Sequence, residues 1–201
     1  MSTLFEFATP IYSSFVSSEN VEAIQNEFMY AFNTYKKVDR FVNPNGFQDT
    51  HLISSYSFND KLFDDFNCNT FVKELHSHIK KYLLECNSLL DKEQLNNYVI
   101  DSSWMAWNEP DSYTAVHDHS DSDISGCYYV TANGDEGDLY FLNPNRLFTT
   151  SFCFKSTKDI ISFRPEAGKL ILFPSWLLHG VRRNITSNDR LSVSFNIKFK
   201  K

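Results

Sequence analysis

Two stretches in the first half of the chain carry apolar residues at helical spacing. In residues 18–37, steps of three and four separate Val21, Ile24, Phe28, Phe32 and Tyr35. In residues 70–90, the same steps separate Val72, Leu75, Ile79, Leu83 and Cys86. This spacing places the apolar side chains on one face, so each stretch is predicted to be an amphipathic helix with one buried side.

From about residue 97 the pattern changes to that of short strands. Segments rich in aromatic and β-branched residues follow one another, from "NYVIDSSWMAWNE" through "ISGCYYV", "DLYFLNP", "SFCFKS", "DIISF" and "KLILFPS" to "RLSVSFNIKF". A turn is expected at Asn133-Gly134 or Glu136-Gly137, and "LFEFATPIYSSF" near the N-terminus reads as an opening strand. The pattern predicts a mainly β fold, a sandwich or jelly roll, with the two helices covering one sheet.

The domain organisation expected from the sequence is a single unit. The chain has 201 residues, which is typical of one domain, and its 42% hydrophobic and 16% aromatic content is ample for a core. No internal repeat or linker separates the two halves. We therefore expect one domain over 1–201, with a helix-rich flank at 1–95 and a jelly-roll core at 96–201.

Charge and cysteine usage exclude several classes of protein. The formal net charge of −6 argues against binding of a phosphate backbone as the main activity. The four cysteines are widely spaced without a C-x-x-C pair, which predicts neither a disulfide framework nor a zinc-thiolate site. The N-terminus lacks the pattern of a signal peptide, and no apolar run is long enough for a membrane span. These features predict a cytoplasmic protein, in the host cytoplasm if the source is viral.

The first candidate for chemistry is "HDHSDSD", residues 117–123, at the start of the strand expected to end in "GCYYV". On a strand His117 and His119 would share a face, and Asp121 would join them if the strand persists. His179, just beyond the apolar strand "KLILFPS", is the candidate third ligand. Three ligands on one side of an ion leave the opposite positions open, as a facial non-haem iron(II) site requires.

The second candidate is the pair Arg190 and Ser192, two residues apart on the last expected strand. Both side chains would point to the same side of the sheet. A guanidinium presents a fork of donors that matches a carboxylate, and the hydroxyl adds another donor. A buried Arg needs an anionic partner, and the only acidic neighbour in this segment is Asp189. The pair therefore predicts an anionic ligand.

At this point the sequence resembles a family of iron(II)- and 2-oxoglutarate-dependent oxygenases found in bacteria and marine bacteriophages. The resemblance is carried by "HDHSDSDISGCYYV", "GDLYFLNP", "PEAGKLILFPSWLLHGV" and "RLSVSFN". It also includes "WMAWNEPDSYTAVH" and the early "NPNGFQDT", so it spans most of the chain. The resemblance implies a prolyl-hydroxylase-like double-stranded β-helix that binds iron(II) and 2-oxoglutarate.

The same resemblance implies the roles of individual residues. The metal would chelate the 2-oxo acid end of 2-oxoglutarate, while Arg190 binds the far carboxylate with assistance from Ser192. Tyr129, the second Tyr of "CYYV", matches a position whose hydroxyl binds that carboxylate in similar hydroxylases. Asn108, just before the metal-binding segment, would add a polar contact.

Two ligand sets remain open on the sequence alone. The family pattern gives His117, His119 and His179, whereas the wider superfamily carries one carboxylate, which would be met by His119, Asp121 and His179. The choice matters because three neutral imidazoles leave an iron(II) centre at +2, while one carboxylate lowers it to +1.

The function expected is a dioxygenase that consumes O₂ and 2-oxoglutarate, hydroxylates a substrate and releases succinate and CO₂. The alternatives are a cupin-like three-His metalloprotein that does not use 2-oxoglutarate, and an inactive jelly-roll binding module. The substrate class stays open between a small molecule and a protein side chain. No membrane or nucleic-acid partner is expected, and the sequence leaves the oligomeric state open.

Overall fold

The computed structural model describes residues 8–38, 53–56, 60–145 and 158–200. Its helices are α1 (Val21–Lys37), α2 (Leu62–Asp65), α3 (Asn69–Cys86) and the short 3-10 helix η1 (Gln94–Asn96). Its strands are β1 (Tyr12–Phe15), β2 (Ile53–Ser54), β3 (Tyr98–Asn108), β4 (Thr114–His117), β5 (Ile124–Thr131), β6 (Leu139–Leu142), β7 (Ile160–Phe163), β8 (Lys169–Pro174), β9 (His179–Val181) and β10 (Arg190–Phe199).

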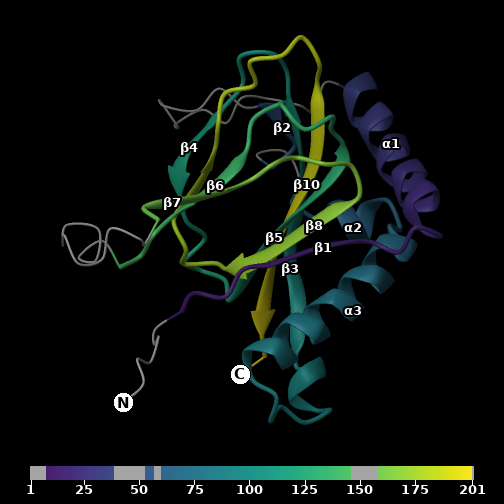
Figure 1. Ribbon diagram of the computed structural model, residues 1–201. Helices are drawn as coiled ribbons and strands as arrows, with labels where there is room; N and C mark the ends of the chain where they lie inside the picture. Colours follow the sequence, from purple (N-terminus) through teal and green to yellow (C-terminus); the bar gives the residue numbers. More distant parts are fainter. Residues whose placement is uncertain (1–7, 39–52, 57–59, 146–157, 201) are drawn as a thin grey trace.

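The strands form two sheets whose described pairs are all antiparallel. The larger sheet has the order β1-β8-β5-β10-β3-β2, and the smaller has the order β4-β9-β6-β7. Figure 1 shows the smaller sheet on one side of the larger one and the helices α1 and α3 on the other side. The predicted fold class is confirmed: the protein is mainly β, with its helices packed on one sheet.

The helices are held on the six-stranded sheet by an aromatic cluster. Phe28 of α1 and Phe71 of α3 lie 4.9 Å apart between ring centroids, and Phe71 lies 4.8 Å from Tyr128 of β5. Phe195 of β10 completes the cluster at 6.1 Å from Phe71. All four side chains are fully buried, and such pairs add roughly 0.5–1.5 kcal/mol each beyond their buried area. The apolar stripes predicted for the two helices therefore face this sheet.

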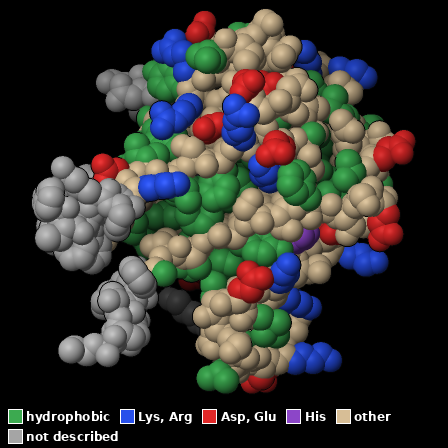
Figure 2. Space-filling view, in the orientation of Figure 1, with side chains coloured by type: hydrophobic (Ala, Val, Ile, Leu, Met, Phe, Trp, Pro, Cys, Tyr) green, Lys and Arg blue, Asp and Glu red, His purple; other side chains and the backbone are tan. Residues whose placement is uncertain are grey.

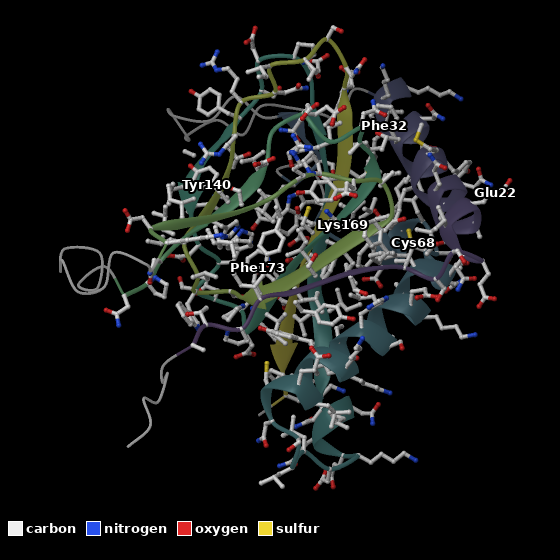
Figure 3. All side chains as sticks on the ribbon, in the orientation of Figure 1. Glu22, Phe32, Cys68, Tyr140, Lys169 and Phe173 are labelled. Atoms are coloured by element: carbon white, nitrogen blue, oxygen red, sulfur yellow. The ribbon has the colours of Figure 1, made fainter. Side chains whose placement is uncertain are left out.

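A second, smaller core lies between the two sheets. Tyr129 of β5 and Phe173 of β8 extend from the larger sheet toward Leu139 and Phe141 of β6. Alternation along a strand explains the division, because Tyr128 enters the helical core while its neighbour Tyr129 enters the inner one. Figure 3 labels one residue of each core: Phe32 of α1 packs against the helical core, and Phe173 lies in the inner core. The inner core is small, and polar side chains occupy much of the remaining space between the sheets.

The first half of the chain contributes more to the sheets than a helical flank would. β1 pairs with β8 at one edge of the larger sheet, and β2 pairs with β3 at the other. The expected turn between β5 and β6 is present, with positive φ at Gly134 and Gly137. The predicted strand "SFCFKS" and the early turn "NPNGFQDT" lie outside the described residues.

The surface gives no sign of a polyanion-binding face in the orientation of Figure 2. Basic and acidic side chains are intermixed there rather than gathered by sign. Among the residues that the structure describes, no helix has both the length and the apolar character needed to cross a bilayer.

Candidate metal centre and anion pocket

The structure brings the three predicted histidines together. His117 ends β4 and stands opposite His179, which begins β9, in the register of the smaller sheet. Their ring centroids are 4.4 Å apart, and each lies 5.1 Å from the ring of His119. One ring nitrogen from each histidine lies within 4.8 Å of the others, close enough for a single ion to bind all three. Sequence-distant imidazoles therefore converge on one point.

The route by which His119 reaches this point differs from the prediction. His117 and His119 do not share one strand that continues into "GCYYV", because β4 ends at His117 and β5 begins at Ile124 in the other sheet. His119 lies in the connection, where its backbone N–H donates to the Ser175 carbonyl at 2.8 Å and its carbonyl accepts from Ser122 N–H at 2.9 Å. The chain changes sheets at this point, and the turn rather than strand alternation aims the His119 ring.

Hydrogen bonds fix the tautomer of all three imidazoles. Nδ1 of His117 lies 2.8 Å from the Ala115 carbonyl, and Nδ1 of His179 lies 2.8 Å from the Leu177 carbonyl. Nδ1 of His119 lies 2.9 Å from Oδ1 of Asn196. Each acceptor is an oxygen, so each Nδ1 carries the proton and each Nε2 keeps its lone pair. Metal-binding histidines are oriented by such outer hydrogen bonds.

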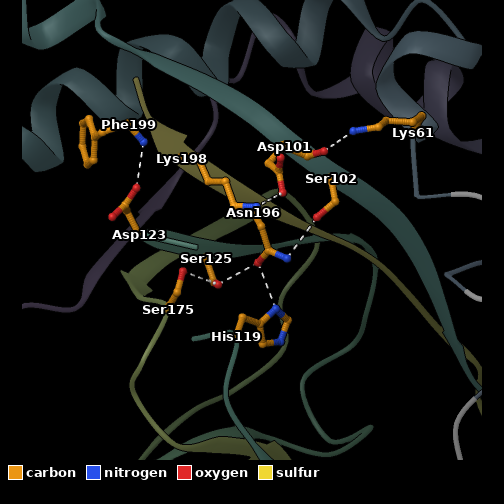
Figure 4. A network of polar contacts seen from close by, with 10 residues as sticks. All are labelled: Lys61, Asp101, Ser102, His119, Asp123, Ser125, Ser175, Asn196, Lys198 and Phe199. Carbon is orange, nitrogen blue, oxygen red and sulfur yellow. Dashed lines mark hydrogen bonds and ion pairs between the residues drawn. The ribbon is translucent and has the colours of Figure 1, made fainter. Parts of the chain in front are cut away.

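Asn196 of β10 is the centre of the polar network that supports His119 (Figure 4). Its Oδ1 also accepts from Ser125 Oγ at 2.7 Å, and its Nδ2 donates to Ser102 Oγ at 3.0 Å. Ser125 lies 2.8 Å from Ser175 Oγ. Both Ser102 and Ser125 are register partners of Asn196 on the flanking strands, so the larger sheet builds this network directly.

Burial favours neutral imidazoles. Desolvation lowers the pKa of His119 to about 4 and that of His179 to about 3, and it also lowers the pKa of His117. The proximity of the three rings contributes further, since a charge on His117 lowers the pKa of both neighbours. Neutral imidazoles are the form that binds a metal ion.

The alternative ligand Asp121 is not part of this cluster. Its side chain is exposed, and no carboxylate joins the three ring nitrogens among the described residues. The geometry therefore favours the three-histidine set over the one that contains Asp121.

A second group of polar residues lies deeper between the sheets. A small cavity of about 80 Å³ is lined by His117, His119 and His179 at one part and by Arg190, Ser192, Tyr129 and Asn108 at another. Seven of the eight residues singled out from the sequence thus border one space, and Asp121 does not. The described lining contains a guanidinium and no carboxylate, so the cavity suits an anion.

Strand register explains why the four deeper residues meet. Arg190 of β10 stands opposite Asn108 of β3, and Ser192 stands opposite Tyr129 of β5. They occupy neighbouring positions on three adjacent strands, on the face that looks toward the smaller sheet. The side chains of Arg190 and Ser192 therefore do lie on the same side, as their spacing of two predicted.

Arg190 is 2% exposed and has only neutral partners. Its Nη2 donates to Asn108 Oδ1 at 2.7 Å, and its Nη1 donates to the carbonyls of Gly137 at 2.5 Å and Glu136 at 3.5 Å. The nearby Glu136 carboxylate instead accepts hydrogen bonds from the amides of Asn133 and Gly134. The guanidinium charge is consequently left without a counter-ion within the described residues.

Three hydrogen-bond donors around the cavity are buried without an oxygen or nitrogen partner: Arg190 Nε, Asn108 Nδ2 and the Tyr129 hydroxyl. The Tyr129 hydroxyl neighbours the thiol of Cys127, which is a weak hydrogen-bonding group. Unpaired buried donors cost roughly 1–3 kcal/mol each and are rare in folded proteins. Three such donors, one of them part of the unneutralised guanidinium itself, fit a bound carboxylate.

Sequence reasoning missed Asn196 and its serine partners, although a signal was present. In "RLSVSFN" every second residue from Arg190 is polar: Arg190, Ser192, Ser194 and Asn196. A strand face that is polar along its length, inside a two-sheet fold, indicates a polar interior rather than an apolar core. The full alternation, rather than its first two members, would have identified Asn196.

Comparison with solved structures identifies the class of fold. SnoK, a non-heme alpha ketoglutarate dependent carbocyclase from nogalamycin biosynthesis, superposes with a TM-score of 0.66 at 12% identity, covering 94% of this chain and 79% of that one. A prolyl-4-hydroxylase from Pseudomonas putida gives 0.57 at 12% identity, with 96% and 89% covered. HygX from Streptomyces hygroscopicus, solved with nickel and 2-oxoglutarate bound, gives 0.57 at 15% identity, with 96% and 83% covered. The protein has the double-stranded β-helix fold of 2-oxoglutarate-dependent oxygenases.

The family match agrees with the fold. Residues 102–196, which include all eight residues singled out from the sequence, match the family described as "Putative 2OG-Fe(II) oxygenase". This match confirms the resemblance seen in the sequence motifs. No curated protein matches the chain, and these comparisons do not support a bacteriophage origin.

Proposed function

We propose that the protein is an iron(II)- and 2-oxoglutarate-dependent dioxygenase that hydroxylates an organic substrate. His117, His119 and His179 would hold the metal through Nε2. Iron(II), 2-oxoglutarate and O₂ together supply oxidising power at the metal, with release of succinate and CO₂. The observation that carries the proposal is the shared cavity, which joins three free imidazole nitrogens to an unneutralised, buried guanidinium.

The polar groups of the cavity fit a dicarboxylic acid better than they fit a metal alone. Three donors there lack an oxygen or nitrogen acceptor: Arg190 Nε, Asn108 Nδ2 and the Tyr129 hydroxyl. Ser192 adds a hydroxyl on the same wall. A carboxylate offers about four lone-pair sites and can receive all of these donors. A metal-only protein would have no use for this second half of the cavity.

The protein's own contribution is then positioning and exclusion of water. The outer hydrogen bonds of the imidazoles hold the metal-binding nitrogens toward the cavity. Leu139, Phe173 and Val181 line the space between the sheets and limit the entry of water around the co-substrate. The three neutral ligands would leave a bound iron(II) ion with its full +2 charge, which strengthens its attraction for an anionic chelator.

Equilibrium binding tests this proposal without a known substrate. Under argon, 2-oxoglutarate affinity is measured by isothermal titration calorimetry with and without manganese(II) as a redox-stable replacement for iron(II). We expect manganese(II) to raise the affinity for 2-oxoglutarate, and the variant His179→Ala to abolish that gain. Metal binding with no binding of 2-oxoglutarate would instead support a three-His metalloprotein, and the loss of both would support an inactive binding module.

A further inference from the structure

Two of the three histidines, His117 and His119, also border a second, larger space on the outer side of the candidate metal centre. This outer cavity has a volume of about 400 Å³. His117, His119, Trp104 and Thr114 line both it and the inner cavity, so the two spaces meet at the histidines. His179 lines only the inner cavity. If the inner cavity holds the co-substrate, the outer one is where a substrate can approach the metal.

The two cavities differ in the sign of their charge. The described lining of the inner cavity contains Arg190 and no carboxylate, whereas the outer one contains four carboxylates and a single cationic side chain, Lys198. The four carboxylates are contributed by three parts of the fold, because Asp118 and Asp121 share the connection between β4 and β5, whereas Asp101 lies in β3 and Asp60 precedes α2. With neutral histidines, the residues that the structure describes around the outer cavity therefore carry a formal net charge of −3 (four carboxylates against one ammonium).

The one cation does not make the outer cavity a site for anions. Lys198 Nζ lies 2.9 Å from Asp101 Oδ2, and Figure 4 shows the pair at the edge of the His119 network. The hydrogen bond to Asp101 raises the pKa of Lys198, and the charges of Asp121 and Asp123 raise it further. The ammonium is thus already matched, and the carboxylates of Asp60, Asp118 and Asp121 are left to set the potential.

Aromatic side chains form part of the wall. Trp104 stacks on the ring of His119, with centroids 5.7 Å apart and planes at 17°. Tyr56 meets Trp104 edge-on at 4.9 Å and is half exposed. An aromatic face next to carboxylates is a favourable environment for an organic cation, because ring quadrupole and negative charge attract it together.

We propose that the outer cavity binds the substrate through an organic cation, an alkylammonium or guanidinium group, held beside Asp60, Asp118 and Asp121. The assignment of this ligand as substrate rests on the proposed oxygenase function. Its binding does not, because the charge and the walls of the cavity exist without metal or 2-oxoglutarate. The cation can be a free amine or part of a peptide side chain, since the chemistry of recognition is the same.

The test compares probes of similar shape and different charge on the metal-free, 201-residue protein. Ligand-observed NMR gives dissociation constants for N-acetyl-lysinamide and its uncharged counterpart N-acetyl-norleucinamide, and for the same pair within a short peptide. We expect the lysine probe to bind about tenfold more tightly at low ionic strength, with the preference shrinking as salt is added. A stronger preference for the lysine peptide than for the free amide would identify a peptide-borne group, and the reverse a free amine.

The double variant Asp118→Asn, Asp121→Asn should remove most of that preference. A matched control is Asp135→Asn, which changes another exposed aspartate that is ion-paired with Arg164 and lines neither cavity. Equal affinity for the charged and uncharged probes, no binding of the lysine probe, or an unchanged preference in the double variant would overturn the inference. None of these outcomes bears on 2-oxoglutarate binding, so the proposed oxygenase function is tested separately by the calorimetric titration.

Discussion

His119 donates its Nδ1–H to Oδ1 of Asn196 at 2.9 Å, across a link between residues 77 positions apart in the chain. Asn196 is in turn held by serines on both neighbouring strands, so the ring of His119 is fixed by the larger sheet although it lies in a turn. The other two histidines donate to carbonyls of their own segments. The metal centre therefore depends more on the long-range contact between His119 and Asn196 than on the local contacts of His117 and His179.

Substitution of Asn196 by Leu should weaken metal binding. Leu keeps a similar volume but removes the acceptor that fixes the tautomer and orientation of His119. Loss of such an outer hydrogen bond costs about 10- to 100-fold in metal affinity. Cobalt(II) titration followed by visible absorption measures the change.

The matched control is Ser102→Ala, which removes the partner at the other end of Asn196 and leaves the Oδ1 contact in place. It should change metal affinity much less than Asn196→Leu does. Equal losses in the two variants would show that the network acts on folding as a whole rather than on His119.

Tyr129→Phe should weaken the binding of 2-oxoglutarate without lowering the stability of the protein. The Tyr129 hydroxyl is buried without an oxygen or nitrogen partner, so its removal should leave the free energy of unfolding unchanged or raise it by up to about 1–3 kcal/mol. Affinity for 2-oxoglutarate should nevertheless fall, because the hydroxyl is a donor in the anion pocket. Urea denaturation and calorimetric titration measure the two effects. A destabilised variant with intact 2-oxoglutarate affinity would assign Tyr129 to packing alone.

Arg190→Lys should weaken 2-oxoglutarate binding while metal binding persists. Lysine retains the charge but not the planar fork of donors, and hydrogen bonds to charged groups are worth about 1.5–3 kcal/mol, or roughly 10- to 100-fold in affinity. Calorimetry with manganese(II) and 2-oxoglutarate measures both constants. Arg183→Lys is the matched control, because Arg183 forms an exposed ion pair with Asp111 away from the cavity. A parallel loss of metal affinity in the Arg190 variant would argue against separate metal and anion subsites.

The metal-free protein should lose stability as the pH falls from about 6.5 to about 4. In the unfolded chain the histidines take up protons near pH 6.5, whereas in the folded protein burial holds the pKa of His119 at about 4 and that of His179 at about 3. The unfolded state therefore binds more protons in this window, and the free energy of unfolding falls by at most about 1.4 kcal/mol per pH unit for each such imidazole. Denaturation curves at several pH values measure the slope. His179→Gln should make it shallower, and an unchanged slope would mean that His179 is not protected from protons.

Gly126 lies where the core has no room for a side chain. A Cβ placed there would lie 2.3 Å from Cζ of Phe195, whose ring covers Gly126 from the opposite position on β10. Phe195 belongs to the aromatic cluster that holds the helices, so it cannot move freely. Gly126→Ala should lower the free energy of unfolding by about 1–3 kcal/mol, as overpacking does. Gly134→Ala, at a loop position with a φ of +112°, would instead introduce backbone strain without overpacking. Thermal or chemical denaturation measures both, and a neutral Gly126→Ala would show that the cluster is loosely packed.

The sequence predicted much of this fold because its periodic signals are local. The stripes from Val21 to Tyr35 and from Val72 to Cys86 gave both long helices, and alternation in "RLSVSFN" gave β10 and the common side of Arg190 and Ser192. From the sequence we could expect His117 and His179 to lie close together, but it is the antiparallel pairing of β4 with β9 that places them opposite each other.

What the sequence did not reveal depends on contacts between distant segments. The position of His119 in a turn, where the chain passes from one sheet to the other, follows from its hydrogen bonds to Ser175 and Asn196. The acidic outer cavity likewise brings Asp60 and Asp101 together with the segment that contains Asp118 and Asp121. No short-range pattern encodes such a grouping, because it exists only after the sheets have formed.

The most direct test of the central claim is an anaerobic titration of the protein with iron(II) and 2-oxoglutarate, followed by visible absorption. If three imidazoles hold the metal and Arg190 anchors the acid, a weak charge-transfer band should appear only when both components are present, and Arg190→Lys should shift its half-saturation to higher 2-oxoglutarate concentration. A folded protein that gives no such band would contradict the account.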